Sequence, residues 1–236
     1  MDNTARTRQR VLALFLPVAA VLYISAEALS PKGTDQVVTT TATAFKVLPI
    51  AAQHSTQLYL ASWLALLGLG ALAVSYAAIA TLVRDRGSAL ATIAALLGGL
   101  GAFSGAIVNV INYPGLAAAA TAHVSRGAAA KVLMAGFNSE FFHVFAYVYF
   151  ASEYLAPLLM AIALWRSRSV PRWLAVLFFV GLGAAEQMSS MGPIVVLYML
   201  PFAAAMVLLA ARIWQAAGTV PAGRIHSLEP AVDVPA

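Results

Sequence analysis

Six long apolar stretches constrain the fold of this chain more than any other feature of its sequence. They cover residues 11–30, 55–83, 89–113, 140–165, 173–188 and 191–214. A membrane-spanning helix needs about 20 predominantly apolar residues, because the hydrocarbon layer is about 30 Å thick. The chain as a whole is 61% hydrophobic, against about 45–50% in ordinary soluble domains. The sequence therefore predicts an all-α, polytopic membrane helix bundle of about six transmembrane helices, formed by residues 1–215 as one domain.

The distribution of basic residues predicts the orientation of the bundle. With a cytoplasmic N-terminus, the inner side carries Arg6, Arg8, Arg10, Arg84, Arg86, Arg166, Arg168, Arg172, Arg212 and Arg224. The outer side then carries Lys32, Lys46, Arg126 and Lys131. Lys and Arg are enriched in cytoplasmic loops, so we expect a multi-pass protein of the cell membrane with both termini in the cytoplasm. Residues 216–236 are polar and contain Pro and Gly, and they are expected to form a disordered cytoplasmic tail.

The N-terminal apolar stretch follows Arg6, Arg8 and Arg10, a pattern that also occurs in secretory signal peptides. Its apolar run is about 19 residues long, whereas the apolar region of a signal peptide has about 7–15 residues. We therefore interpret it as a retained signal-anchor helix, with a cleaved signal peptide as the alternative.

Two outer segments, residues 31–54 and 115–138, are too apolar for simple loops. The second is expected to form helices over residues 117–124 and 128–134, with a turn near Arg126-Gly127. Both segments would then cover the outer end of the bundle; the alternative is that they are ordinary extracytoplasmic loops. In the third stretch, Gly101 and Gly105 form a pair of small residues four apart, a spacing that predicts close packing between helices.

Polar residues gather at the outer side of the predicted bundle and are scarce in its inner half. The set consists of Glu27, His54, Gln57, Asn109, Asn112, Asn138, Glu140, His143, Glu153, Glu186 and Gln187. A charged group at the centre of a bilayer costs about 2.5–3.5 kcal/mol on insertion scales, so ionisable residues within spans usually have a function. We predict a polar cavity in the outer half of the bundle, closed on the inner side by apolar packing.

The fourth stretch combines acids with aromatic rings. At 3.6 residues per turn, one stripe holds Glu140, His143, Tyr147, Phe150 and Tyr154, and a second holds Phe142, Phe145, Tyr149 and Glu153. Burial among rings favours the protonated form of an acid, and ring faces stabilise positive charge. This combination suits an acid that protonates an alkene or epoxide to give a carbocation. Tyr23 and Glu27, four residues apart in the first stretch, repeat the pairing of ring and acid.

From this pattern we derive candidate site residues. The candidate catalytic residues are Glu153, Glu27 and Glu186. The candidate substrate-binding residues are Tyr23, His54, Asn109, Asn112, Glu140, Phe142, His143, Tyr147, Tyr149 and Tyr154.

Each of these assignments has a structural alternative. Glu27 and Glu140 can be solvated at the level of the lipid headgroups, and His54 and His143 can be interfacial residues. The asparagines can join helices by hydrogen bonds, and the outer aromatic residues can belong to an interfacial belt.

Motifs of other function classes are absent from the sequence. There is no cysteine, which excludes disulfides, thiol catalysis and thiolate metal sites. No metalloprotease, phosphate-loop or serine-hydrolase motif occurs, and no continuous basic patch predicts binding to nucleic acid. No lysine lies within a span, which excludes a retinal-type Schiff base. A haem held by His54 and His143 is the one cofactor alternative, and we expect no cofactor and no metal.

Two resemblances follow from these residues. The arrangement of short spans, with the segment Ala-Leu-Trp-Arg-Ser-Arg-Ser-Val-Pro-Arg-Trp over residues 163–173, resembles a broad set of actinobacterial membrane proteins and implies no function. The buried acids and aromatic linings resemble the integral-membrane terpene cyclases of meroterpenoid pathways. That resemblance implies a prenylated substrate within the lipid bilayer, whose cyclisation is started by a proton from Glu27, Glu153 or Glu186. A small proton-coupled transporter or exporter and a non-catalytic membrane subunit are the alternatives, and the sequence leaves the oligomeric state open.

Overall fold

A computed structural model describes residues 3–34, 36–83, 86–187 and 194–218 of this chain. These residues form eight α-helices in the order α1 (Asn3–Leu29), α2 (Thr41–Gln53), α3 (Ser55–Ala80), α4 (Ser88–Thr121), α5 (Arg126–Phe137), α6 (Glu140–Ser167), α7 (Arg172–Gln187) and α8 (Val195–Gly218). The all-α prediction is confirmed for this described part of the chain.

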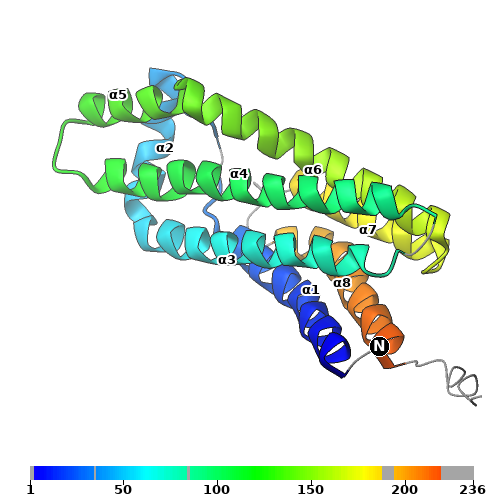
Figure 1. Ribbon diagram of the computed structural model, residues 1–236. Helices are drawn as coiled ribbons and strands as arrows, with labels where there is room; N and C mark the ends of the chain where they lie inside the picture. The colour runs from blue at the N-terminus through cyan, green and yellow to red at the C-terminus, as the bar shows by residue number, and fades with distance from the viewer. Residues whose placement is uncertain (1–2, 35, 84–85, 188–193, 219–236) are drawn as a thin grey trace, which may run out of the picture.

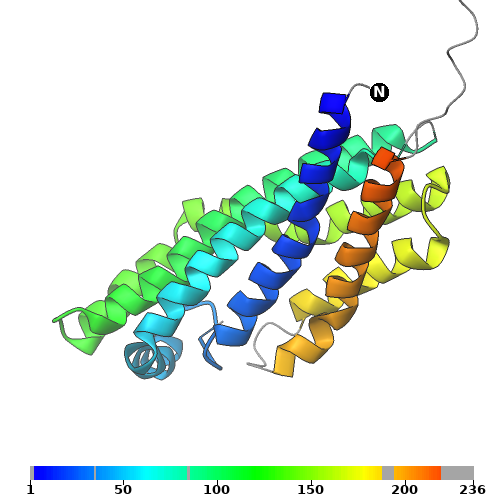
Figure 2. The same ribbon diagram turned by 90° about the horizontal axis from the view of Figure 1, so that it is seen from below.

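Six of the helices form a ring of neighbours that run in alternating directions. Each helix in the order α1, α3, α4, α6, α7 and α8 packs against the next, and α8 packs against α1 to close the ring. Figures 1 and 2 show that the N-terminal end of α1 and the C-terminal end of α8 lie at the same end of the bundle. The short helices α2 and α5 lie at the opposite end, where they contact each other and α4.

Among the described residues, five helices are long and apolar enough to cross a membrane, namely α1, α3, α4, α6 and α8. The sixth predicted span corresponds to α7, whose 16 described residues extend to Gln187. The described part of the chain therefore supports a multi-pass membrane protein. The tight turn that we expected at Ser189-Ser190 lies outside the described residues.

The segment between α4 and α6 differs in detail from the prediction. Helix α4 continues through Pro114 to Thr121 and so includes most of the short helix that was expected over residues 117–124. The turn expected near Arg126-Gly127 lies a few residues earlier, over residues 122–125, and both of these residues are already in α5. Ser125 begins α5 instead: its side chain accepts a hydrogen bond of 3.2 Å from the backbone N–H of Ala128, which satisfies a free N–H in the first helical turn.

The first outer segment is also partly helical. Thr40 caps α2 by accepting a hydrogen bond of 3.2 Å from the N–H of Thr43, and Thr41 of α2 contacts Met134 of α5. Together α2 and α5 cover one end of the bundle, as expected of segments that are not simple loops.

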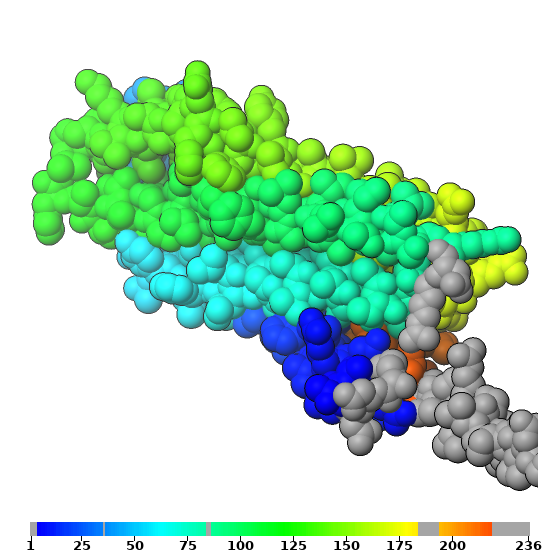
Figure 3. Space-filling view, in the orientation of Figure 1, coloured from blue at the N-terminus to red at the C-terminus, as the bar shows by residue number. Residues whose placement is uncertain are grey.

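In the space-filling view, α3 and α4 lie directly against each other along the face of the bundle shown in Figure 3.

The glycines of α4 allow this close packing. A Cβ atom placed on Gly101 would lie 2.6 Å from Ser152 Cβ of α6, and one on Gly105 would lie 2.7 Å from the ring of Tyr149. A Cβ on Gly98 would overlap the ring of Tyr76 in α3. The predicted packing role of Gly101 and Gly105 is thus confirmed.

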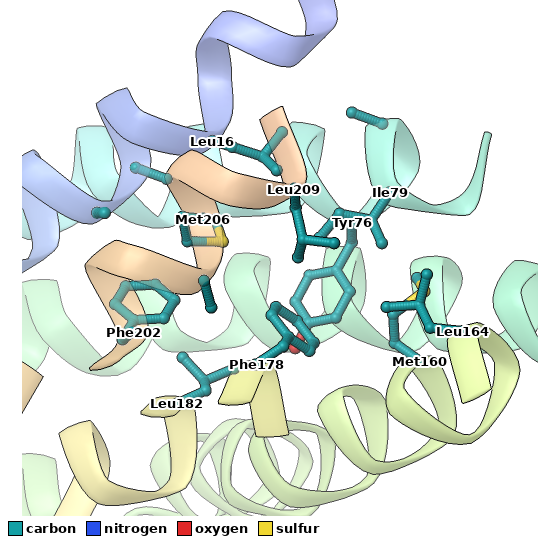
Figure 4. Packing of buried hydrophobic residues seen from close by; sticks show 14 of the residues in the cluster. Leu16, Tyr76, Ile79, Met160, Leu164, Phe178, Leu182, Phe202, Met206 and Leu209 are labelled. Atoms are coloured by element: carbon teal, nitrogen blue, oxygen red, sulfur yellow. The ribbon is translucent and has the colours of Figure 1, made fainter. Parts of the chain in front are cut away.

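Buried side chains fill the part of the bundle toward the N-terminal end of α1 and the C-terminal end of α8. Figure 4 shows Tyr76, Phe178, Phe202, Met206 and Leu209 packed together from α3, α7 and α8. Tyr76 and Phe178 meet edge to face, with ring centroids 6.1 Å apart. We call this region, around these five residues, the packed half. A second buried cluster lies under α2 and α5 and includes Tyr113, Leu116, Phe137 and Phe142.

The basic residues divide between the two ends of the bundle. Most of the arginines expected on the inner side are described by the structure. They lie at or near the helix ends of the packed half: Arg6, Arg8, Arg10, Arg86, Arg166, Arg168, Arg172 and Arg212. Lys32, Lys46, Arg126 and Lys131 lie at the α2–α5 end. Arg84, Arg224 and most of the predicted tail lie outside the described residues, and Ala216–Gly218 belong to α8.

Candidate functional site

A cavity with a volume of about 270 Å³ lies between the packed half and the cluster under α2 and α5. Its lining comes from α1, α3, α4, α5 and α6 and from the segment between α1 and α2. The lining includes these candidate residues: Tyr23, Glu27, Asn109, Asn112, Phe142, Tyr149, Glu153 and Tyr154. The structure thus brings together most of the polar and aromatic residues singled out in the sequence. We call this region, around Glu27, Asn112 and Glu153, the cavity half.

Two carboxyl side chains reach the cavity from different helices. Glu27 lies near the end of α1, one helical turn after Tyr23, and only 7% of its surface is exposed. Glu153 lies thirteen residues after the first residue of α6 and is half-buried. Helix α1 runs toward the α2–α5 end and α6 runs away from it, so residues that are more than a hundred positions apart in sequence line the same space.

Two amide side chains of α4 lie on the wall of the cavity. Asn109 Oδ1 accepts a hydrogen bond of 2.6 Å from Ser62 Oγ, which joins α4 to α3. Asn112 follows three residues later on the same helical face. Its Oδ1 atom is buried and accepts no hydrogen bond from the described residues. Because a buried acceptor is costly when it is unsatisfied, Asn112 is suited to bind a hydroxyl or N–H group of a ligand.

The structure also distinguishes the two stripes of α6. Phe142, Tyr149 and Glu153 belong to one stripe, and all three line the cavity. Phe142 is buried and meets Phe137 of α5 edge to face, with centroids 5.0 Å apart. The other stripe faces outward, but Phe150 and Tyr154 are only about half-exposed and reach the cavity at its edge.

A second, smaller space adjoins the cavity on the side of the packed half. A small pocket of about 30 Å³ lies between Glu153, Tyr149, Tyr76 and Gly98. It shares Leu69, Tyr149 and Glu153 with the larger cavity. A space of this size is sufficient for about one water molecule. Beyond it the interior is filled by the rings and aliphatic side chains of Figure 4.

Four of the candidate residues whose side chains the structure describes lie outside the lining of this cavity, and a fifth candidate, Glu186, cannot be placed. His54 lies between α2 and α3 and is partly buried, and Glu140 and His143 are exposed in the first turn of α6. Tyr147 is 73% exposed on the outward stripe. Glu186 lies near the end of α7, and its side chain is outside the described part. Substrate binding by the first four and catalysis by Glu186 stay predictions.

Some lining residues were not among the candidates. Phe137, Tyr113 and Val37 line the cavity from α5, from α4 and from the segment before α2. Tyr113 follows Asn112 directly, and Phe150 shares a stripe with Tyr154, so both carried a signal in the sequence. Phe137 and Val37 did not, because their positions depend on how the α2–α5 end folds over the bundle.

The residues that could hold a metal ion are few. Among the residues that the structure describes, no group of three or more histidine, aspartate or glutamate side chains is arranged to bind one. The two histidines of the haem alternative, His54 and His143, lie outside the cavity lining.

Comparison with known proteins adds no relative to this picture: no family model, no curated protein and no solved structure matches the chain.

Proposed function

We propose that this protein is a membrane-embedded enzyme that acts on an amphiphilic, isoprenoid-type substrate by acid-initiated cyclisation or isomerisation. One observation carries the proposal: Glu27 and Glu153 line a single cavity together with the rings of Tyr23, Tyr149 and Tyr154. A proton donor, a proton acceptor and rings that stabilise a cation are the three components that such a reaction needs.

The proposed reaction uses the two carboxyl groups in turn. Glu153, as the carboxylic acid, gives its proton to one carbon of a substrate alkene, which leaves a carbocation and the Glu153 carboxylate. The electrons of a second alkene then form a carbon–carbon bond to the cation. Glu27, as the carboxylate, removes a proton from a neighbouring carbon to form a new alkene. The product is an isomer of the substrate, and proton exchange with solvent restores both groups without a metal or an organic cofactor.

Aromatic rings supply the stabilisation that this intermediate requires. A cation within about 6 Å of a ring centroid is attracted by the negative ring face, by about 2 kcal/mol or more in a dry site. Tyr149 and Phe150 are neighbours with centroids 5.3 Å apart, and Tyr23 meets Phe202 edge to face at 6.4 Å. The rings are therefore held by packing on both the α1 and the α6 side of the cavity.

The shape of the cavity supports an amphiphilic substrate. Asn109 and Asn112 lie on its α4 wall, where they can bind a polar end group, whereas Leu69, Val108 and Phe142 form apolar wall suited to a hydrocarbon chain. Phe150 and Tyr154 line the cavity and are 49% and 46% exposed. A substrate dissolved in the bilayer can enter beside these two rings without crossing the packed half.

The first test is mass spectrometry of lipid extracts from cells that express the wild type, Glu153→Gln or Glu140→Gln. Each culture receives a pool of farnesylated and geranylgeranylated precursors. We expect an isomer with the mass of a precursor in the wild type, and a loss of about 10²–10⁴-fold in Glu153→Gln, the usual contribution of a positioned acid. Glu140→Gln is the matched comparison on the same helix, because Glu140 is exposed and lies outside the cavity lining; a loss in this variant would instead support the predicted role of Glu140 in substrate binding.

An equal yield of the isomer from all three folded proteins would rule out Glu153 as the acid. The absence of any isomer would favour a small proton-coupled transporter, for which the water-sized pocket beside Glu153 is the specific observation. In that case, we expect proton-coupled uptake of substrate into vesicles that Glu153→Gln abolishes and Glu140→Gln does not.

A further inference from the structure

A groove on the outer face of the bundle lies between α6 and α7, well away from the cavity. Its volume is about 320 Å³. It is lined by Leu158, Ala161, Ile162, Trp165, Ala175, Val176 and Phe179. Every one of these side chains is apolar or aromatic, and the polar groups of the cavity half take no part in the groove.

Arginines lie at one end of this groove. The guanidinium carbon of Arg172 lies 5.0 Å from the centroid of the Trp165 ring, within the range of a cation–π interaction. Arg166 lies in the last turn of α6 and Arg168 directly follows this helix, and residues 165–173 contain no acidic residue. The apolar groove thus ends where three arginines follow one another closely in the sequence, with Arg172 placed beside Trp165.

We infer that this groove binds an anionic phospholipid. One acyl chain lies along α6 and α7, and the phosphate contacts Arg172 and its neighbouring arginines. Basic pockets between transmembrane helices are a known type of site for anionic headgroups, and arginine donates hydrogen bonds in a geometry that suits phosphate. The inference is independent of the proposed reaction, because it uses other residues.

The dimensions of the groove favour a lipid chain over a protein helix. The lining residues on α6 extend from Leu158 to Trp165, a length of about 10 Å at 1.5 Å per residue. A groove of this length offers a packing surface to only about two turns of a partner helix, at about 5.4 Å per turn. An acyl chain matches an entirely apolar lining, and its headgroup then reaches Arg172 beside Trp165.

Fluorescence quenching by brominated lipids tests this inference. The chain has four tryptophans, and the variant Trp63→Phe, Trp173→Phe, Trp214→Phe keeps Trp165 as the only reporter. This protein is reconstituted into phosphatidylcholine vesicles that contain a small fraction of brominated phosphatidylglycerol or brominated phosphatidylcholine. We expect stronger quenching by the brominated phosphatidylglycerol. Arg172→Gln should reduce this preference about fivefold, the effect of one arginine near a membrane surface.

Two controls separate a specific site from general attraction to the positive end of the protein. Arg212→Gln removes an exposed arginine of α8 at the same end and should leave the preference of Trp165 unchanged. The variant Trp63→Phe, Trp165→Phe, Trp173→Phe keeps Trp214, which has Arg10 5.3 Å from its ring centroid, and should show a weaker preference. Equal quenching of Trp165 by both lipids, or the same preference at Trp214, would overturn the inference.

Discussion

The interior of the bundle is filled by side chains in the packed half and left open in the cavity half. Phe178 and Phe202 are fully buried in the packed half, whereas Tyr149 and Glu153 in the cavity half line a space of about 270 Å³. Helices α1, α3, α4 and α6 contribute to both halves, whereas α7 and α8 fill only the packed half and α5 lines only the cavity half. Protein interiors are close-packed, so an open space of this size lined by carboxyl and amide groups supports the ligand site proposed above.

The largest difference that we expect between the two halves follows from replacing one phenylalanine by alanine in each. Phe202→Ala in the packed half should lower the free energy of unfolding by at least about 2 kcal/mol, because the cavity term of a buried truncation remains even in lipid. Phe150→Ala at the edge of the cavity should cost less than about 1 kcal/mol, since this ring is half-exposed. Thermal unfolding in detergent measures both. Equal losses would show that the two halves are packed alike.

A second test adds volume instead of removing it. Ala94→Leu in the packed half should destabilise the protein by about 1–3 kcal/mol, because Ala94 is completely buried among neighbouring side chains. Ala65 lines the cavity. Ala65→Leu should therefore leave the stability of the fold nearly unchanged but reduce the binding of substrate. Unfolding temperatures together with the product assay distinguish the two effects. A large destabilisation by Ala65→Leu would mean that the cavity closes in the membrane.

A third test uses two glycines of α4 that are two residues apart. Gly101→Ala should cost about 1–3 kcal/mol, since its Cβ would lie 2.6 Å from Ser152 Cβ. Gly99→Ala meets no atom within 4 Å and should be neutral or stabilising by up to about 1 kcal/mol, owing to the better helix propensity of alanine. The difference in unfolding temperature between the two variants is the measurement. If both behave alike, α4 and α6 are farther apart than the structure places them.

Much of the fold can be predicted from the lengths of the apolar stretches alone. The site also depends on which stripe of α6 faces inward, and the sequence does not determine this. Long hydrophobic stretches determine where α1, α3, α4, α6 and α8 lie, because lipid tolerates few other structures. The sequence also indicated an acid in a ring-rich cavity. It did not distinguish which stripe of α6 faces inward, since both contain acids and rings, and only packing against Gly101 and Gly105 of α4 decides this.

The missed features have the same physical origin. Phe137 and Val37 reach the cavity because α2 and α5 pack over the end of the bundle. Tertiary contacts of this kind leave no periodicity in the sequence. The turn expected near Arg126-Gly127 lies a few residues earlier for a local reason: Ser125 caps the start of α5, and Gly127 is tolerated in the first turn that follows.

The smallest predicted effect concerns two buried serines, one with and one without a side-chain hydrogen bond between helices. Ser62 Oγ donates to Asn109 Oδ1 at 2.6 Å and so holds α3 and α4 together beside the cavity. Hydrogen bonds between helices in membranes contribute about 0.6 kcal/mol on average, and Ser62→Ala should lower the unfolding free energy by about that amount. Ser104, completely buried in α4, makes no side-chain hydrogen bond within the described residues, so Ser104→Ala should be neutral or slightly stabilising. No measurable loss from Ser62→Ala would show that the polar contact beside the cavity contributes no stability, and that Asn109 is held in place by packing alone.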